Sequence, residues 1–185
     1  YNRRLRTMSG PEGSSIKNVR LCVVAFLKEN KMTDIEYMKI AFNEALKAYK
    51  EDEVPVGAII VKDNVIISQA YNLKEKKQLV TKHAEIIAIE EAEKVLKTWH
   101  LDDCTLYTTL EPCLMCSGAI IQSRIKRVVY GCSENRWSSL SSLLKKENLN
   151  HYPTITAHIY EKECSMLISS YFKEKRVNNR ISLEV

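Results

Sequence analysis

Two short motifs constrain the fold of this 185-residue chain more than any other feature. His83 and Glu85 stand one residue apart at the head of an apolar-periodic segment, and Pro112, Cys113 and Cys116 follow a β-rich run. Cysteines at i and i+3 in the first turn of a helix share one face, so one ion can bind both. The unpaired N–H groups at a helix start also favour the thiolate that zinc requires. We therefore expect the fold to bring the starts of two helices together around one zinc ion.

The predicted metal ligands are His83, Cys113 and Cys116, with one Zn²⁺ in each subunit. One imidazole and two thiolates leave the fourth tetrahedral position open. A structural zinc closes that position with a protein side chain, whereas a catalytic zinc keeps water there and lowers the pKa of that water towards about 7. Glu85 is close to the ion and is not needed as a ligand, so it suits a carboxylate that takes a proton from water and passes it on.

A closed zinc knuckle is the alternative interpretation of these motifs. In a knuckle, Cys104, Cys132 or His100 fills the fourth position, and Glu85 is only a solvated helix residue. A knuckle has no use for a carboxylate beside the histidine. A plainer alternative is a pair of core cysteines with an unrelated histidine. The joint occurrence of both motifs favours the open, catalytic site over either alternative.

Length and composition fit one ordinary globular domain. The apolar run LCVVAFL at 21–27 is too short to cross a bilayer and ends in charged residues, so we expect no membrane segment. Six cysteines without a loop-rich composition favour reduced thiols over a secreted disulfide framework. These features predict a cytoplasmic protein, or an organellar one if the basic leader is a native transit segment.

The charge of the chain is concentrated at its start. Residues 1–31 hold seven basic and two acidic residues, which accounts for the whole net charge of +5. Together with the turn-forming stretch SGPEGSS, this composition predicts a flexible or leader-derived extension. The zinc domain is expected at 32–178 and a C-terminal tail at 179–185. Because the domain is formally neutral, its net charge is no argument that it binds nucleic acid.

Helix and strand patterns alternate along the domain. The expected elements are a helix at 34–50 after a capping box of Thr33 and Glu36, a hairpin turning at Asp63 and Asn64, a helix at 83–97, a strand at 105–110, a helix from Pro112 to about Ser123, a strand at 127–131, a short helix near 139–146, a strand at 154–160 and a terminal helix. This alternation predicts an α/β fold of three α-β-α layers. Its mixed five-stranded sheet is expected to carry helices on both faces.

The segment from 32 to 176 resembles the bacterial-type tRNA adenosine deaminases, which convert the wobble adenosine of an anticodon to inosine. The resembling stretches are EVPVGAIIV at 53–61, YN at 71–72, HAEIIAI at 83–89, TLEPCLMCSGAIIQSRIKRVVYG at 109–131 and YFKEKR near the end. The paired H-x-E and P-C-x-x-C motifs are the signature of zinc nucleobase deaminases. The resemblance implies a cytidine-deaminase-like fold, a tRNA anticodon stem-loop as substrate and a homodimer.

The resemblance also implies roles for individual residues. It assigns Glu85 to carry a proton to N1 of adenine and then to the departing amine, and Asn72 to bind the base. It implies substrate contacts for Val56, Gly57 and Glu111 as well. From the residue types alone, Asn72 is equally consistent with a left-handed loop position, and Glu111 with shaping the turn before a proline. Sheet packing is the corresponding alternative for Val56 and Gly57.

The chain departs from this family after VVYG. It continues with CSENRWSSL at 132–140, where the family has a small residue, an acid, a lysine and a glycine. In the family this loop borders bound RNA, so we expect altered recognition and unaltered catalysis. Two other functions remain open: a deaminase of a free base or nucleoside such as guanine, cytosine or cytidine, and a non-catalytic zinc-stabilised RNA-binding or partner subunit. Glu85 argues against the second of these.

Overall fold

The computed structural model describes residues 31–133, 138–145 and 148–181. Its elements are α2 (Asp34–Lys50), β1 (Gly57–Lys62), β2 (Val65–Tyr71), α3 (Lys74–Lys77), α4 (Ala84–Leu96), β3 (Cys104–Leu110), α5 (Leu114–Gln122), β4 (Arg127–Cys132), α6 (Leu140–Leu143), β5 (Thr154–Thr156) and α7 (Glu161–Ile181). All of them belong to one compact unit that begins at Thr33. The predicted N-terminal extension up to residue 30, and 134–137 of the departing loop, lie outside the described residues.

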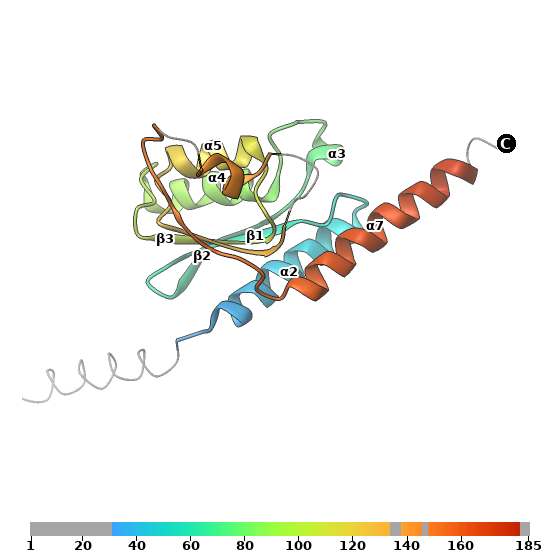
Figure 1. The fold of residues 1–185 in the computed structure, drawn as a ribbon, viewed down its shortest axis with the longest axis horizontal. Coiled ribbons are helices and arrows are strands. Elements are labelled where there is room, and N and C mark those ends of the chain that lie inside the picture. Colours follow the sequence, from blue (N-terminus) through green and yellow to red (C-terminus); the bar gives the residue numbers. More distant parts are fainter. Residues whose placement is uncertain (1–30, 134–137, 146–147, 182–185) are drawn as a thin grey trace, which may run out of the picture. The chain divides into compact units, whose positions relative to one another are not determined.

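One sheet with strand order β2-β1-β3-β4-β5 forms the centre of this unit. The first hairpin and the β1–β3 pair are antiparallel, whereas β3–β4 and β4–β5 are parallel. Helices α2 and α7 pack on one face of the sheet, and α4 and α5 lie on the other (Figure 1). The predicted mixed five-stranded sheet with helices on both faces is therefore confirmed.

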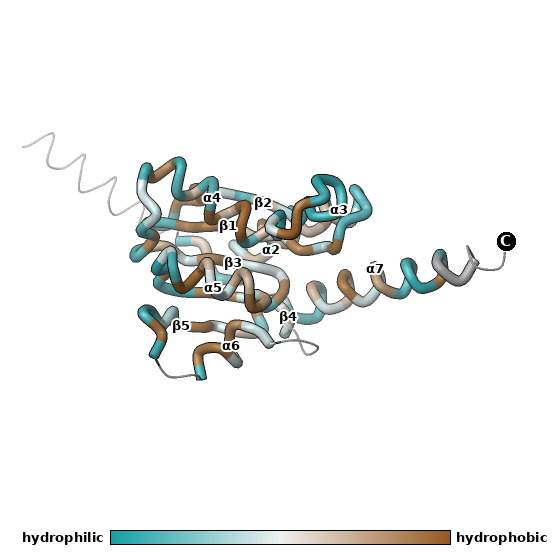
Figure 2. Tube along the Cα trace, turned by 90° about the horizontal axis from the view of Figure 1, so that it is seen from above, coloured by the Kyte–Doolittle hydropathy of each residue, from teal (hydrophilic) through white to brown (hydrophobic). Residues whose placement is uncertain are grey.

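Both faces of the central strands are buried, so β1 is hydrophobic along much of its length (Figure 2). Ile60, Leu106 and Val128 belong to one core cluster with the alanines of α4. Tyr107 points to the opposite face, where its ring lies 5.0 Å from that of Tyr37 on α2. Strands buried on both sides read as continuous apolar runs rather than as alternating patterns.

Two local boundary signals act as their sequences predict. Thr33 Oγ1 accepts a hydrogen bond from the N–H of Glu36 at 3.3 Å, and the Glu36 carboxylate accepts one from the N–H of Thr33 at 2.7 Å, which completes the capping box of α2. Asp63 and Asn64 both have left-handed φ, at 51° and 63°, between β1 and β2. Positive φ at both central residues is the geometry of a type I′ hairpin turn.

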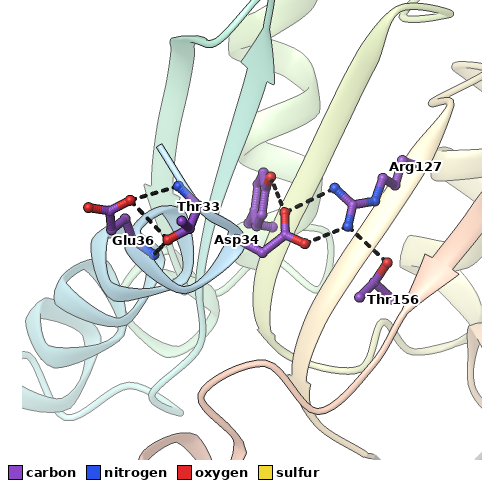
Figure 3. A network of polar contacts seen from close by, with 6 residues as sticks. Thr33, Asp34, Glu36, Arg127 and Thr156 are labelled. Carbon is purple, nitrogen blue, oxygen red and sulfur yellow. Dashed lines mark hydrogen bonds and ion pairs between the residues drawn. The ribbon is translucent and has the colours of Figure 1, made fainter. Parts of the chain in front are cut away.

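A polar network joins the first turn of α2 to three strands (Figure 3). The guanidinium of Arg127 on β4 donates to both Asp34 oxygens at 3.0 and 2.6 Å, and to Thr156 Oγ1 on β5 at 2.9 Å. The Tyr107 hydroxyl on β3 donates to Asp34 at 2.8 Å. The start of α2 is thus fixed against the parallel half of the sheet.

The expected start of the cysteine helix at Pro112 is wrong. Helix α5 begins at Leu114, and its N-cap Cys113 is extended, with φ −69° and ψ 173°. The physical reason is pairing with a distant segment. Cys113 forms an isolated antiparallel bridge with Ser139, and the Pro112 carbonyl accepts a hydrogen bond from the N–H of Leu140 at 3.0 Å.

Three other expectations differ in extent. The last strand ends at Thr156 because His158 and Tyr160 adopt left-handed φ of 65° and 61°, which strand geometry excludes. Helix α6 spans only four residues, and α7 runs on to Ile181. The short helix α3 has no apolar period and was not expected. None of the helices in the described ranges is long and apolar enough to span a membrane.

Candidate metal centre

Two helix starts bring the three predicted ligands together. His83 is the N-cap of α4, Cys113 is the N-cap of α5, and Cys116 lies in the first turn of α5. His83 Nδ1 is 3.7 Å from Cys113 Sγ and 3.5 Å from Cys116 Sγ, and the two sulfurs are 3.7 Å apart. A tetrahedral zinc with Zn–S of about 2.3 Å and Zn–N of about 2.1 Å requires edges of roughly 3.6–3.8 Å. The three atoms therefore fit a zinc ion without rearrangement.

Among the described residues, these three form the one group of histidine, cysteine or acidic side chains close enough to share an ion. The three residues considered as a fourth zinc ligand lie outside this group. Cys132 Sγ donates to the carbonyl of Thr109 at 3.4 Å, and His100 Nδ1 lies 3.2 Å from a carboxylate oxygen of Asp102. Cys104 is buried at the start of β3. The closed-knuckle interpretation is thus contradicted, and the fourth position has no protein ligand in the described chain.

The two thiols form a strongly polarised pair. The hydrogen bond between the two sulfurs, with a further contribution from His83, lowers the pKa of Cys113 to about 4. The same hydrogen bond, together with burial, raises the pKa of Cys116. The hydrogen bond to Cys113 raises the pKa of His83. Zinc binds cysteine as the thiolate, so an ion held by both sulfurs displaces the protons of the two thiols.

Glu85 lies beside the ligand group without joining it. It is 4% exposed, in the first turn of α4, and its carboxyl contacts the Cys116 thiol. Burial, the largest effect, raises its pKa to about 7. A buried carboxyl that lies outside the ligand group and two residues after a metal ligand is placed to exchange protons with a molecule in the open coordination position.

Asn72 is fixed by hydrogen bonds to both sides of the site. Its Oδ1 accepts from the N–H of Ala84, the residue after His83, at 2.9 Å. Its own N–H donates to the carbonyl of Val56 at 3.1 Å. Asn72 is buried and has a negative φ, so the interpretation as a left-handed loop residue is wrong. Binding of a base by the Asn72 side chain stays a prediction, and it would use the NH₂ group while Oδ1 keeps its hydrogen bond to Ala84.

Val56 and Gly57 have clear packing roles. Val56 is 5% exposed and belongs to the core cluster under α4. A Cβ on Gly57 would lie 2.0 Å from the carbonyl oxygen of Ala41, so glycine is what allows α2 to approach β1. The Gly57 N–H donates to Thr109 Oγ1 at 3.1 Å, which links β1 to the end of β3. A contact of Val56 or Gly57 with substrate stays a prediction.

Glu111 anchors the segment that follows the departing loop. Its carboxylate accepts a hydrogen bond from the N–H of Ser141 at 3.0 Å, and its N–H donates to the Cys132 carbonyl at 2.8 Å. With the Cys113–Ser139 bridge, this contact seats α6 on the loop that carries the first cysteine ligand. Sequence reasoning did not identify this support, because its partners lie some thirty residues apart and no local pattern connects them. Substrate binding by Glu111 stays a prediction.

A mixed sheet with an imidazole and two thiols at the starts of two helices, and a metal-free carboxyl beside them, defines a zinc-dependent deaminase. The family model of the cytidine and deoxycytidylate deaminase zinc-binding region matches residues 31–132. The chain belongs to this family, together with the tRNA-specific adenosine deaminases that it matches over most of its length. The predicted cytidine-deaminase-like fold and zinc cofactor are confirmed.

Three known proteins are similar to the chain in sequence or structure. It is 43% identical over 143 residues to the tRNA-specific adenosine deaminase of Bacillus subtilis, a match that covers 76% of this chain and 89% of that protein. A solved structure from work on A-to-I editing by tRNA:A34 deaminases is 34% identical, with a TM-score of 0.69, and covers 71% of this chain and 98% of its own. The guanine deaminase of Bacillus subtilis is 35% identical, with a TM-score of 0.54, and covers 68% and 87%.

Proposed function

We propose that the protein is a hydrolase that deaminates adenosine to inosine at the wobble position of a tRNA anticodon. The observation that carries the deamination is the open three-ligand site with the Glu85 carboxyl beside it. Two findings support a tRNA as the substrate. The match to the tRNA-specific adenosine deaminase of Bacillus subtilis covers 89% of that protein. The structure from the work on tRNA:A34 deaminases has a TM-score of 0.69, compared with 0.54 for the guanine deaminase.

Each residue of the site has a defined task in this reaction. Zinc, when bound by His83, Cys113 and Cys116, supplies a Lewis acid that makes water a nucleophile near neutral pH. Glu85 takes one proton from the attacking water and delivers it to N1 of adenine. It then takes the second proton from the new hydroxyl on C6 and hands it to the amine, so that the C6–N bond breaks and the C6 carbonyl of inosine forms. Water and adenosine thereby give inosine and ammonia, and Glu85 returns to its starting state.

The base is held by groups that face the metal centre. The Asn72 NH₂ donates to an acceptor atom of the purine, while its Oδ1 stays on the N–H of Ala84. Val56 and Gly57 form the floor of the pocket at the start of β1, and Glu111 borders it from the cysteine loop. An anticodon loop suits such a pocket because its unstacked bases can enter without breaking a duplex.

We also infer that the enzyme acts as a homodimer. Leu114, next to the ligand Cys113, is 54% exposed, and a Cβ on Gly118 would meet nothing within 4 Å. A second subunit packed on this part of α5 would bury Leu114 beside the catalytic centre. Sedimentation of the active protein at the mass of two chains is the expected result, and a fully active monomer would contradict the inference.

A comparison of separate substrates distinguishes tRNA editing from its main alternative, deamination of a free base or nucleoside. Purified protein is incubated with anticodon stem-loops that carry adenosine at the wobble position or at a neighbouring position, and separately with free adenine, guanine, cytosine and cytidine. Inosine in the wobble substrate alone is the expected product. Guanine is the essential comparison, since a guanine deaminase is a relative at 35% identity. Conversion of free guanine without stem-loop editing would establish the alternative.

A further inference from the structure

A buried carboxylate outside the metal centre anchors the loop that leads into it. Glu53 precedes β1 and is fully buried, at 0% exposure. One of its oxygens accepts from the N–H of Glu75 at 3.0 Å and the other from the N–H of Lys76 at 2.7 Å. These N–H groups lie in the first turn of α3, where no earlier helical carbonyl can accept them. The N-cap of α3, Leu73, makes no side-chain capping bond, so Glu53 caps this helix from 22 residues away.

Helix α3 sits inside the loop that connects two site residues. Asn72 stands at one end of the loop and His83 at the other. The N–H of Leu73 donates to the Lys82 carbonyl at 3.0 Å and closes the neck of the loop. The Asn72 side chain adds a second closure through its bond to the N–H of Ala84. Any displacement of α3 therefore acts on the segments that carry Asn72 and His83.

The loop has little apolar packing to hold it in place. No residue of α3 is buried, and Leu79 and Val80 are 50% and 67% exposed. The α3 region is hydrophilic in Figure 2. Segments with few buried apolar contacts open locally at low cost in free energy. The position of this loop must therefore come from its polar attachments.

Among the attachments of α3 in the described chain, Glu53 is the strongest. The ion pair between Lys76 Nζ and Glu51, at 2.8 Å, joins side chains that are 56% and 32% exposed. Such exposed pairs contribute little because water screens them. Hydrogen bonds from backbone N–H groups to a buried carboxylate are shorter and stronger. Their loss would also leave the fully buried Glu53 carboxylate without these two donors.

The backbone that follows Glu53 also contacts Asn72. It lies three residues before Val56, whose carbonyl accepts from the N–H of Asn72 at 3.1 Å. The segment 53–56 thus holds the loop by hydrogen bonds at two places. Glu53 binds backbone N–H groups of α3, and the Val56 carbonyl binds the N–H of Asn72. Together these contacts set the loop against the start of β1.

We propose that Glu53 is a positioning residue for the deamination: it fixes α3 and thereby holds Asn72 and the rim of the loop at 73–82 in the geometry that presents the base to the metal centre. The inference rests on the proposed function. Glu53 itself touches neither the ligand group nor the base, so its effect passes through backbone N–H groups of α3.

The test compares two buried glutamates. In Glu53→Gln, an amide NH₂ replaces one acceptor oxygen and faces a backbone N–H. The matched control is Glu44→Gln: Glu44 is also buried, at 5% exposure, but its carboxylate pairs with Lys47 on its own helix α2 at 2.6 Å. For both variants the measurements are zinc content, amide hydrogen exchange, and kcat and KM on the wobble stem-loop.

The expected pattern is local and specific. Both variants retain one zinc per chain, and exchange accelerates at 73–84 in Glu53→Gln alone. The kcat/KM of Glu53→Gln falls at least about tenfold, since small misplacements of a bound base are costly, while the control stays within about twofold of the parent. Equal kinetics in the two variants, or faster exchange spread over the whole sheet, would overturn the proposal.

Two further arms keep the result decisive. If Glu53→Gln does not fold, Glu53→Asp retains the charge with a shorter reach, and the same local exchange and loss of kcat/KM are expected of it. If the parent enzyme converts guanine and not the stem-loop, the proposed function fails. The comparison of the two glutamate variants is then made with guanine, and hydrogen exchange still reports whether Glu53 fixes the loop.

Discussion

Cys116 Sγ lies 3.5 Å from His83 Nδ1, although the two residues belong to the starts of different helices. Their meeting depends on the sheet, because α4 and α5 lie side by side on one face of it (Figure 1). Each helix presents its N-terminal end, where unpaired N–H groups stabilise thiolate and developing negative charge. The fold thus supplies both the ligands and the electrostatic setting of the site.

Replacement of Glu85 is expected to separate metal binding from turnover. Because Glu85 is not part of the ligand group, Glu85→Ala and Glu85→Gln retain one zinc per chain. Turnover falls by about 10²- to 10⁴-fold, the usual contribution of a positioned proton carrier. Elemental analysis and chromatographic detection of inosine check the two halves of this prediction. Activity within tenfold of the parent would rule out the proton-carrier role.

Removal of a ligand is expected to abolish zinc binding. Cys116→Ala leaves an imidazole and one thiolate, too few groups to hold zinc tightly, so metal content and turnover are both lost. Cys104→Ala is the matched control, since Cys104 is equally buried, at 0% exposure, but lies outside the ligand group. It should lose stability and keep its zinc. Zinc retained in Cys116→Ala would show that the ligand assignment is wrong.

Two substitutions of Asn72 distinguish base recognition from loop closure. Asn72→Asp keeps an acceptor for the N–H of Ala84 and removes the NH₂ donor, whereas Asn72→Ala removes both. The loss of one hydrogen bond to the base, worth roughly 1–3 kcal/mol when a buried group is left unpaired, lowers kcat/KM by about 10- to 100-fold in both variants. If the aspartate variant is fully active and the alanine variant is not, Asn72 only closes the loop.

The capping box of α2 is expected to make stability depend on pH. Hydrogen bonds from Thr33 hold the pKa of Glu36 below its ordinary value of 4.5. Since the folded pKa is depressed, the stabilisation is present above pH 4.5 and is lost as the pH falls through the folded pKa. Glu36→Gln should therefore melt below the parent at pH 7, and the two melting temperatures should converge as the pH falls through the depressed folded pKa of Glu36. A constant difference in melting temperature would contradict this linkage.

Local signals in the sequence were sufficient for much of the fold. The Thr33–Glu36 capping box and the Asp63–Asn64 turn each act within four residues, so pattern and structure agree there. The metal ligands were predictable for a different reason. Their residue types and spacing match what zinc requires, and this requirement holds whatever the path of the chain between the motifs.

Non-local contacts explain what the sequence did not indicate. The start of α5 is delayed because Cys113 pairs with Ser139, which no local pattern shows. Helix α3 lacks an apolar period. Its first turn is stabilised instead by the Glu53 carboxylate, which accepts hydrogen bonds from two of its backbone N–H groups. In both places a residue far along the chain decides the local backbone.

The metal ligands also have a mechanical consequence. His83 and Cys113 are 30 residues apart, so an ion bound to both cross-links the chain and closes a long loop that contains all of α4 and β3. Because the three ligands come together only in the folded chain, zinc binds the native state selectively and its binding free energy stabilises the fold. Zinc supply and the lifetime of the folded enzyme are therefore coupled: scarcity of the ion weakens the scaffold as well as the chemistry.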